Sequence, residues 1–185
     1  MTSLLFETGL IAAIGGGIVF AEAGLAKFRH RALVPGVVAN YRILPGWAVA
    51  PVAAWLPAVE VGLALALFAS VLTGGAVRGA AGAAAALLVV FGAAMAINIV
   101  RGRRMIDCGC GRSQLRQPLG WGLVLRNGVL AALMTIHALT SPTRESVGVA
   151  ELALALVAGS ALFLMILLFN SLTALAASPL ASGRR

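Results

Sequence analysis

The two cysteines of this chain, Cys108 and Cys110, are its only cysteines and are separated by a single residue, Gly109. A disulfide across so short a loop closes a very small ring, so it gains little from loop entropy as a structural crosslink. The strain expected of so tight a bond makes it easy to reduce. The spacing therefore favours thiol–disulfide exchange, in which one sulfur forms a mixed disulfide with a client and the other resolves it.

The residues around the cysteine pair favour a reactive thiolate. Five arginines flank the pair and bias a nearby thiol toward its thiolate form: Arg101, Arg103, Arg104, Arg112 and Arg116. Gly109 supplies the backbone freedom that a small ring requires. Asp107 either accepts a proton during exchange or raises the pKa of the adjacent thiol, and the sequence leaves both roles open.

Other chemistries for the pair remain as alternatives. Two thiolates suit Cu(I), although only Met105 and the distant His30 would be candidates for a further ligand. A zinc site would need four ligands at a familiar spacing, so we expect no resident metal. The pair could also be unreactive, in a membrane assembly factor or a carrier of Cu(I) or a small molecule whose cysteines are not redox-active.

The composition predicts the scaffold that positions this pair. Hydrophobic residues make up 61% of the chain and charged residues only 11%, which is typical of a membrane protein. At about 20 residues per crossing, 185 residues predict a single all-α domain, 1–185, a polytopic membrane helix bundle of about five transmembrane helices with a four-helix core. The predicted helices are 4–28, 48–72, 80–100, 119–139 and 149–175, and the cysteine loop is 101–118. Turn dipeptides at Pro35-Gly36 and Pro45-Gly46 predict a loop up to Trp47.

Three ionisable residues fall inside the predicted helices: Glu22, Glu60 and Arg126. A charge at bilayer depth is costly unless it meets a partner or water. We therefore predict a cluster beneath the cysteines in which Arg126 pairs with Glu22 or Glu60. Such a cluster either locks the bundle or forms a polar pocket that holds a redox partner or relays protons, and the sequence favours neither.

The distribution of basic residues predicts the orientation. The formal net charge is +8, but no basic face with interleaved aromatic residues exists, which argues against nucleic-acid binding. With five crossings, 11 basic residues fall on the side of the cysteine loop and two, Arg78 and Arg144, on the other. The positive-inside rule then predicts an outside N-terminus, an inside C-terminus and cytoplasmic cysteines, with the basic residues near anionic lipid headgroups of the bilayer.

Four motifs in this order resemble one family: Gly24–Phe28, Tyr41–Pro45, Pro57–Glu60 and Asp107–Gly111. Over about residues 5 to 140 the chain resembles the methylamine-utilisation MauE family of DoxX-like membrane proteins. The resemblance implies a protein of the bacterial inner membrane that supports disulfide formation and maturation of the methylamine dehydrogenase small subunit, together with the thioredoxin-like partner MauD. Arg112 departs from the aromatic residue that is frequent near this position in the family.

The resemblance and the charge distribution disagree on one point. The client and partner that the resemblance implies are periplasmic, whereas the basic residues place the cysteines in the cytoplasm. A cytoplasmic pair would need a membrane quinone or a second protein to exchange electrons with a periplasmic client. The expected function is therefore a membrane thiol–disulfide redox protein whose cofactor, if any, is unknown and for which a membrane quinone is a candidate.

Overall fold

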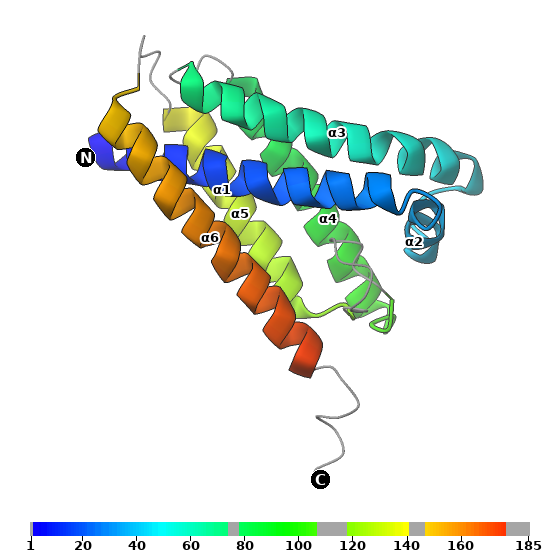
Figure 1. Cartoon of the computed structure of the whole chain (residues 1–185). Helices are drawn as coiled ribbons and strands as arrows, with labels where there is room; N and C mark the ends of the chain where they lie inside the picture. The colour runs from blue at the N-terminus through cyan, green and yellow to red at the C-terminus, as the bar shows by residue number, and fades with distance from the viewer. Residues whose placement is uncertain (1, 74–77, 107–117, 141–146, 177–185) are drawn as a thin grey trace.

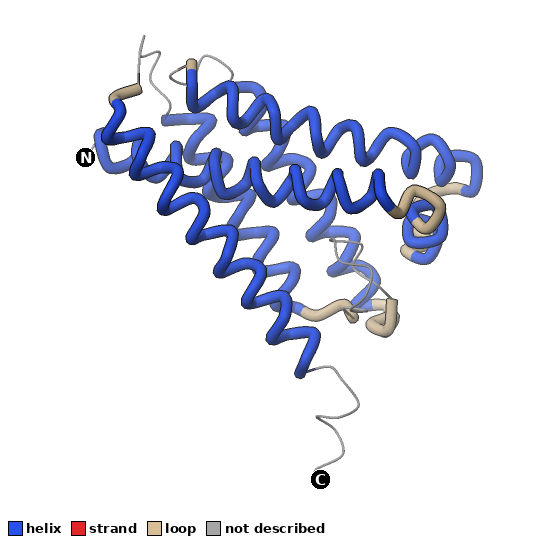
Figure 2. Tube along the Cα trace, viewed as in Figure 1, coloured by secondary structure: helices blue, strands red, loops and turns tan. Residues whose placement is uncertain are grey.

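Five long helices and one short helix form the molecule in the computed structural model, which describes residues 2–73, 78–106, 118–140 and 147–176. The helices are α1 (Thr2–Arg29), α2 (Val34–Asn40), α3 (Gly46–Leu72), α4 (Arg78–Val100), α5 (Trp121–Thr140) and α6 (Val149–Ala176). Figure 1 shows the long helices side by side, and Figure 2 shows that helices make up nearly all of the described chain. The cysteine residues 108 and 110, with Asp107 and Gly109, lie outside the described residues.

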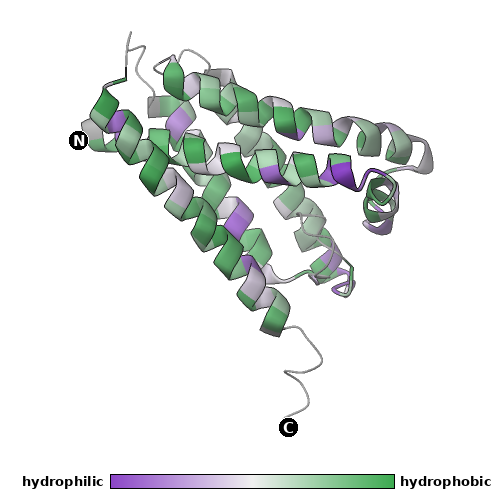
Figure 3. Cartoon of the chain, viewed as in Figure 1, coloured by the Kyte–Doolittle hydropathy of each residue, from purple (hydrophilic) through white to green (hydrophobic). Residues whose placement is uncertain are grey.

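Each of the five long helices is long and apolar enough to cross a membrane. Their bounds agree with the predicted ranges to within about two residues. The helix α3 is continuous through Pro51 and Pro57, as membrane helices tolerate when neighbouring groups satisfy the freed backbone. Figure 3 shows that most residues of these helices are apolar, with a few hydrophilic ones among them, so the predicted all-α membrane bundle is confirmed.

The prediction of a loop up to Trp47 is wrong for residues 34–40, which form the helix α2. Pro35 lies in the first turn of this helix, where its fixed φ favours helix formation and its missing N–H costs nothing. Val34 is buried, and α2 packs against α3. The Pro-Gly dipeptide was read as a turn signal, but here the proline begins a helix.

The helix α1 lies at the centre of the bundle because it packs against α3, α5 and α6. Three consecutive glycines of α1 face three different helices. A Cβ at Gly15 would meet the Gly159 carbonyl of α6 at 3.0 Å, one at Gly16 would meet the side chain of Met134 on α5, and one at Gly17 would meet the ring of Phe68 on α3. Since successive helical residues point about 100° apart, this short run lets three neighbours approach closely, as small residues do between membrane helices.

The helix α6 crosses α1 in Figure 1. It has the smallest buried share of the five candidate spans, 17% of its most apolar window. Its main packing partner is α1. Ala155 and Ile166 of α6 are buried in the main hydrophobic core, whereas about half of the helix is exposed on the surface of the bundle.

Candidate functional site

The structure describes both ends of the segment that carries the cysteines. The Leu119 N–H, just before α5, donates a hydrogen bond of 2.8 Å to the carbonyl oxygen of Arg104, just after α4. This bond brings the two ends of the cysteine segment together. The residues on either side of the cysteine segment therefore meet at one place, between α4 and α5.

A small hydrophobic cluster supports these two ends. Its buried members are Met95 and Ile99 from α4, Leu119 just before α5 and Leu123 in the first turn of α5, and Tyr41, Ile106 and Val124 pack against them. It is separate from the main core of the bundle. Since Ile106 directly precedes the cysteine segment, apolar burial holds the first end of that segment against α4 and α5.

A polar cluster lies beside it, where α4 meets the C-terminal end of α2. The Asn98 side chain is fully buried, and its Nδ2 donates to the Tyr41 carbonyl at 3.1 Å. Arg103 donates through Nη1 to Asn98 Oδ1 at 3.1 Å and through Nη2 to the Asn40 carbonyl at 2.8 Å. Arg101 donates to the Arg42 carbonyl at 3.3 Å. The last carbonyls of a helix have no partner within it and attract cations, so Arg103, which bonds to the carbonyl of Asn40, caps α2 from a distant part of the chain. The acceptor of Arg101 lies just beyond the end of α2.

Glu60 of α3 is 1% exposed and forms an ion pair with Lys27 of α1, whose Nζ lies 2.8 Å from Oε1 and 2.9 Å from Oε2. Gly24 makes this approach possible, because a Cβ there would lie 3.0 Å from the Pro57 carbonyl oxygen and 3.1 Å from the Glu60 Cβ. The pairing of Lys27 with Glu60 differs from the predicted pairing of Glu60 with Arg126. The signal was present, since the Gly24–Phe28 and Pro57–Glu60 motifs of the family resemblance are the two segments that meet here.

Arg126 of α5 contacts α6 rather than standing alone in the bilayer. Its Nη1 donates to Asn170 Oδ1 at 2.6 Å and its Nη2 to Asn127 Oδ1 at 3.2 Å. Glu22 lies half-buried on α1. Glu60 bonds to Lys27. The predicted pairing of Arg126 with Glu22 or Glu60 stays a prediction.

A third polar contact lies near the C-terminal ends of α3 and α5. Ser70 and His137 are both buried, and the Ser70 Oγ and His137 Nε2 are 3.2 Å apart. Gly9 of α1 faces the same imidazole, since a Cβ there would meet His137 Nδ1 at 2.8 Å. The sequence gives no signal for this contact, because nothing in the spacing indicates a partner for His137.

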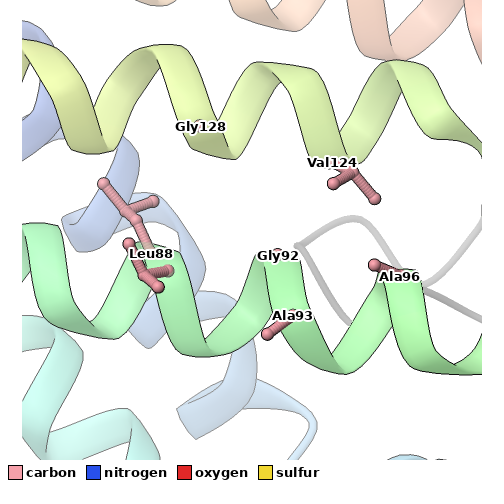
Figure 4. Close-up of a pocket in the computed structure, with 7 residues that line it drawn as sticks. Leu88, Gly92, Ala93, Ala96, Val124 and Gly128 are labelled. Carbon is pink, nitrogen blue, oxygen red and sulfur yellow. The ribbon is translucent and has the colours of Figure 1, made fainter.

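The described residues hold no group of three or more His, Cys, Asp or Glu side chains that could bind a metal ion. They do form an open groove of about 230 Å³ between α4 and α5. Figure 4 shows Leu88, Gly92 and Ala96 on α4 and Val124 and Gly128 on α5 along this groove. Its lining is entirely apolar, so it offers no reacting group.

The fold and these contacts define a multi-pass membrane protein in which the residues flanking its cysteine segment are held together between α4 and α5. A family model described as "Methylamine utilisation protein MauE" matches residues 5–141, which covers α1 to α5 and ends before α6. The chain therefore belongs to the MauE family, and the resemblance predicted from its motifs is confirmed.

Curated relatives support this membership. The chain is 46% identical over 165 residues to the methylamine utilization protein MauE of Paracoccus denitrificans, covering 89% of this chain and 87% of the relative. It is 42% identical over 147 residues to that of Paracoccus versutus (80% and 77% covered) and 38% identical over 149 residues to that of Methylorubrum extorquens (80% and 78% covered). No solved structure matches the chain significantly.

Proposed function

We propose that this protein is a thiol–disulfide redox protein of the bacterial inner membrane that supports maturation of the methylamine dehydrogenase small subunit with the thioredoxin-like protein MauD. The observation that carries the proposal is the sole cysteine pair, Cys108-Gly109-Cys110, in a chain of the MauE family. The relatives are named for methylamine utilization. The pair is also the only thiol chemistry that the sequence offers.

The exchange can be written as two balanced steps. A client thiolate attacks one sulfur of the Cys108–Cys110 disulfide, and the resulting mixed disulfide is resolved by the second client thiolate. The client gains a disulfide, and this protein is left as a dithiol. A disulfide of the thioredoxin-like partner or a membrane quinone then accepts the two electrons and two protons and restores the pair.

The basic end of the bundle supports docking of a partner near the cysteines. Arg29, Arg31, Arg42, Arg101 and Arg104 are all exposed there. Complementary charge raises the rate of encounter with an acidic surface. Arg103 lies among them but is engaged by α2, so the exposed arginines are the ones available to a partner.

The cysteine pair provides the most direct test. We expect Cys108→Ser and Cys110→Ser each to abolish oxidation of the client's cysteines while the variant protein remains in the membrane at its normal level. Both sulfurs are needed to form the disulfide that the client thiolate attacks, so neither single variant should retain turnover. Client disulfides can be counted by mass spectrometry after alkylation of the free thiols.

A matched control removes a sulfur without removing a thiol. Met105 is 90% exposed and lies just before the pair, so Met105→Ser should leave client oxidation unchanged. Normal client disulfides in both cysteine variants would reject the redox function in favour of an assembly factor. Loss of Cu(I) binding in all three variants would favour the Cu(I) carrier.

Sidedness is a separate prediction. With five crossings, and with 11 basic residues on the side of the cysteine segment, the positive-inside rule places Cys108 and Cys110 at the cytoplasmic face. In reduced spheroplasts, a membrane-impermeant maleimide should label the native pair only after the membrane is opened. A cysteine introduced at Thr143 should label at once. Immediate labelling of the native pair would contradict the rule and favour direct exchange with a periplasmic partner.

A further inference from the structure

We propose that Asn98 and Arg103 are positioning residues that fasten the C-terminal end of α2 to the start of the cysteine segment, and so set the surroundings in which the thiols react. The proposal rests on the proposed function for its purpose, but it is carried by contacts among described residues alone. The side chains of Asn98 and Arg103 bond to each other and to the backbone carbonyls of Asn40 and Tyr41. These bonds join elements about 60 residues apart in the chain.

The guanidinium of Arg103 joins Asn98 to the end of α2. Its two terminal nitrogens bond to Asn98 Oδ1 at 3.1 Å and to the Asn40 carbonyl at 2.8 Å, and Nη1 also lies 3.5 Å from the Tyr41 carbonyl. Charge-assisted bonds of this kind are among the stronger hydrogen bonds in proteins. Only the planar fork of an arginine reaches several acceptors in this way, and a lysine presents a single nitrogen.

Asn98 completes the cluster from inside the bundle. It is fully buried, and its Nδ2 bonds both to the Tyr41 carbonyl and to the Ala94 carbonyl of its own helix, each at 3.1 Å. Its Oδ1 accepts from Arg103. A buried amide that satisfies two carbonyls and an arginine at once fixes their relative positions, since loss of any member would leave a buried polar group without its bond.

The cluster is directly connected to the cysteine segment. Arg103 is followed by Arg104, whose carbonyl receives the Leu119 N–H, and by Ile106, which packs with Tyr41 on the cluster of Met95 and Leu123. Holding Arg103 therefore holds the start of the segment against α2. Among the basic residues at this end, Arg103 acts on the thiols through position and not through its charge alone.

The neighbouring Arg104 makes a sharp comparison possible, because its side chain is exposed and it lies one residue closer in sequence to the pair than Arg103 does. We compare Arg103→Lys, Arg103→Gln, Asn98→Leu and Arg104→Gln in the full-length protein. The measured quantity is the rate at which iodoacetamide alkylates the reduced native thiols as a function of pH. Arg103→Lys keeps the charge and removes the fork, whereas Asn98→Leu removes the cluster without changing any charge.

Positioning predicts that Arg103→Lys, Arg103→Gln and Asn98→Leu all slow alkylation near neutral pH by about three- to tenfold and shift its pH profile upward, because the thiolate loses its ordered basic surroundings. Arg104→Gln should have a smaller effect. The double variant Asn98→Leu/Arg103→Lys should be no slower than either single variant, since both remove one unit. Wild-type rates in Arg103→Lys and Asn98→Leu, with equal slowing in Arg103→Gln and Arg104→Gln, would show that charge alone matters and overturn the proposal.

A second measurement does not involve the thiols. The Tyr41 and Arg42 N–H groups donate to the Val38 and Ala39 carbonyls at the end of α2, so Arg103→Lys should increase their hydrogen exchange while Arg104→Gln should not. Unchanged hydrogen exchange in Arg103→Lys would overturn the proposed positioning role of Arg103 even if alkylation slowed. Neither measurement needs the client. If Arg103→Lys changed neither measurement while the cysteine variants still lost client oxidation, the positioning role would be rejected and the proposed function would stand.

Discussion

Replacing Lys27 by Met is expected to lower the free energy of unfolding of the bundle by about 3–5 kcal/mol, the loss measured when one partner of a buried ion pair is removed. Glu60 is 1% exposed and receives the Lys27 ammonium on both carboxylate oxygens. Without that ammonium, its carboxylate would lose both of these bonds inside the membrane. Denaturation by sodium dodecyl sulfate in mixed micelles measures the change.

The partner and control variants show whether pairing causes this loss. Glu60→Gln should also destabilise the protein, and the double variant Lys27→Met/Glu60→Gln should recover part of the loss, because no uncompensated charge remains. Arg29→Met removes a cation that lies two residues further along α1 and is exposed, so it should change stability by less than about 1 kcal/mol. Strictly additive losses in the double variant would argue against the pair as the stabilising unit.

Replacing Gly159 by Val is expected to displace α6 from α1. A Cβ at Gly159 would lie 2.7 Å from the Ile14 Cβ and 3.0 Å from the backbone nitrogen of Gly15. Backbone atoms cannot rotate away as the end of a flexible side chain can, so the two helices must separate. We expect a loss of about 1–3 kcal/mol, which is typical of overpacking, measured by the same denaturation.

Gly62 of α3 is the matched control, because a Cβ there would meet nothing within 4 Å. Gly62→Ala should be neutral or slightly stabilising, since alanine favours a helix by about 1 kcal/mol over glycine. The distance between α1 and α6, measured between spin labels, should increase in Gly159→Val and stay unchanged in Gly62→Ala. An unchanged distance in Gly159→Val would contradict the close crossing of these helices.

The cysteine site was only partly accessible from sequence. Its chemistry follows from residue type, because Cys108 and Cys110 are the only thiols and their spacing favours exchange over structure. The contacts of the residues that flank the cysteine segment do not follow from the sequence. The sequence presents Arg103 and Arg104 alike as flanking cations, and only the structure shows Arg103 bonded to Asn98 and the Asn40 carbonyl while Arg104 stays exposed. Which charges are used structurally depends on how α2 meets α4, and no local pattern encodes that contact.

The sequence by itself determined the class of protein, the five membrane-spanning helices and, through four short motifs, the family. These features follow from local quantities, since the length of an apolar run and the positions of its charges depend on no other helix. Only the tertiary structure decided that α2 forms, that Lys27 is the partner of Glu60 and that Gly15, Gly16 and Gly17 face three different helices. The physical reason is that lipid is as apolar as the interior of the bundle. A membrane helix therefore carries little amphipathic signal, and its rotation and its partners are set by packing among helices.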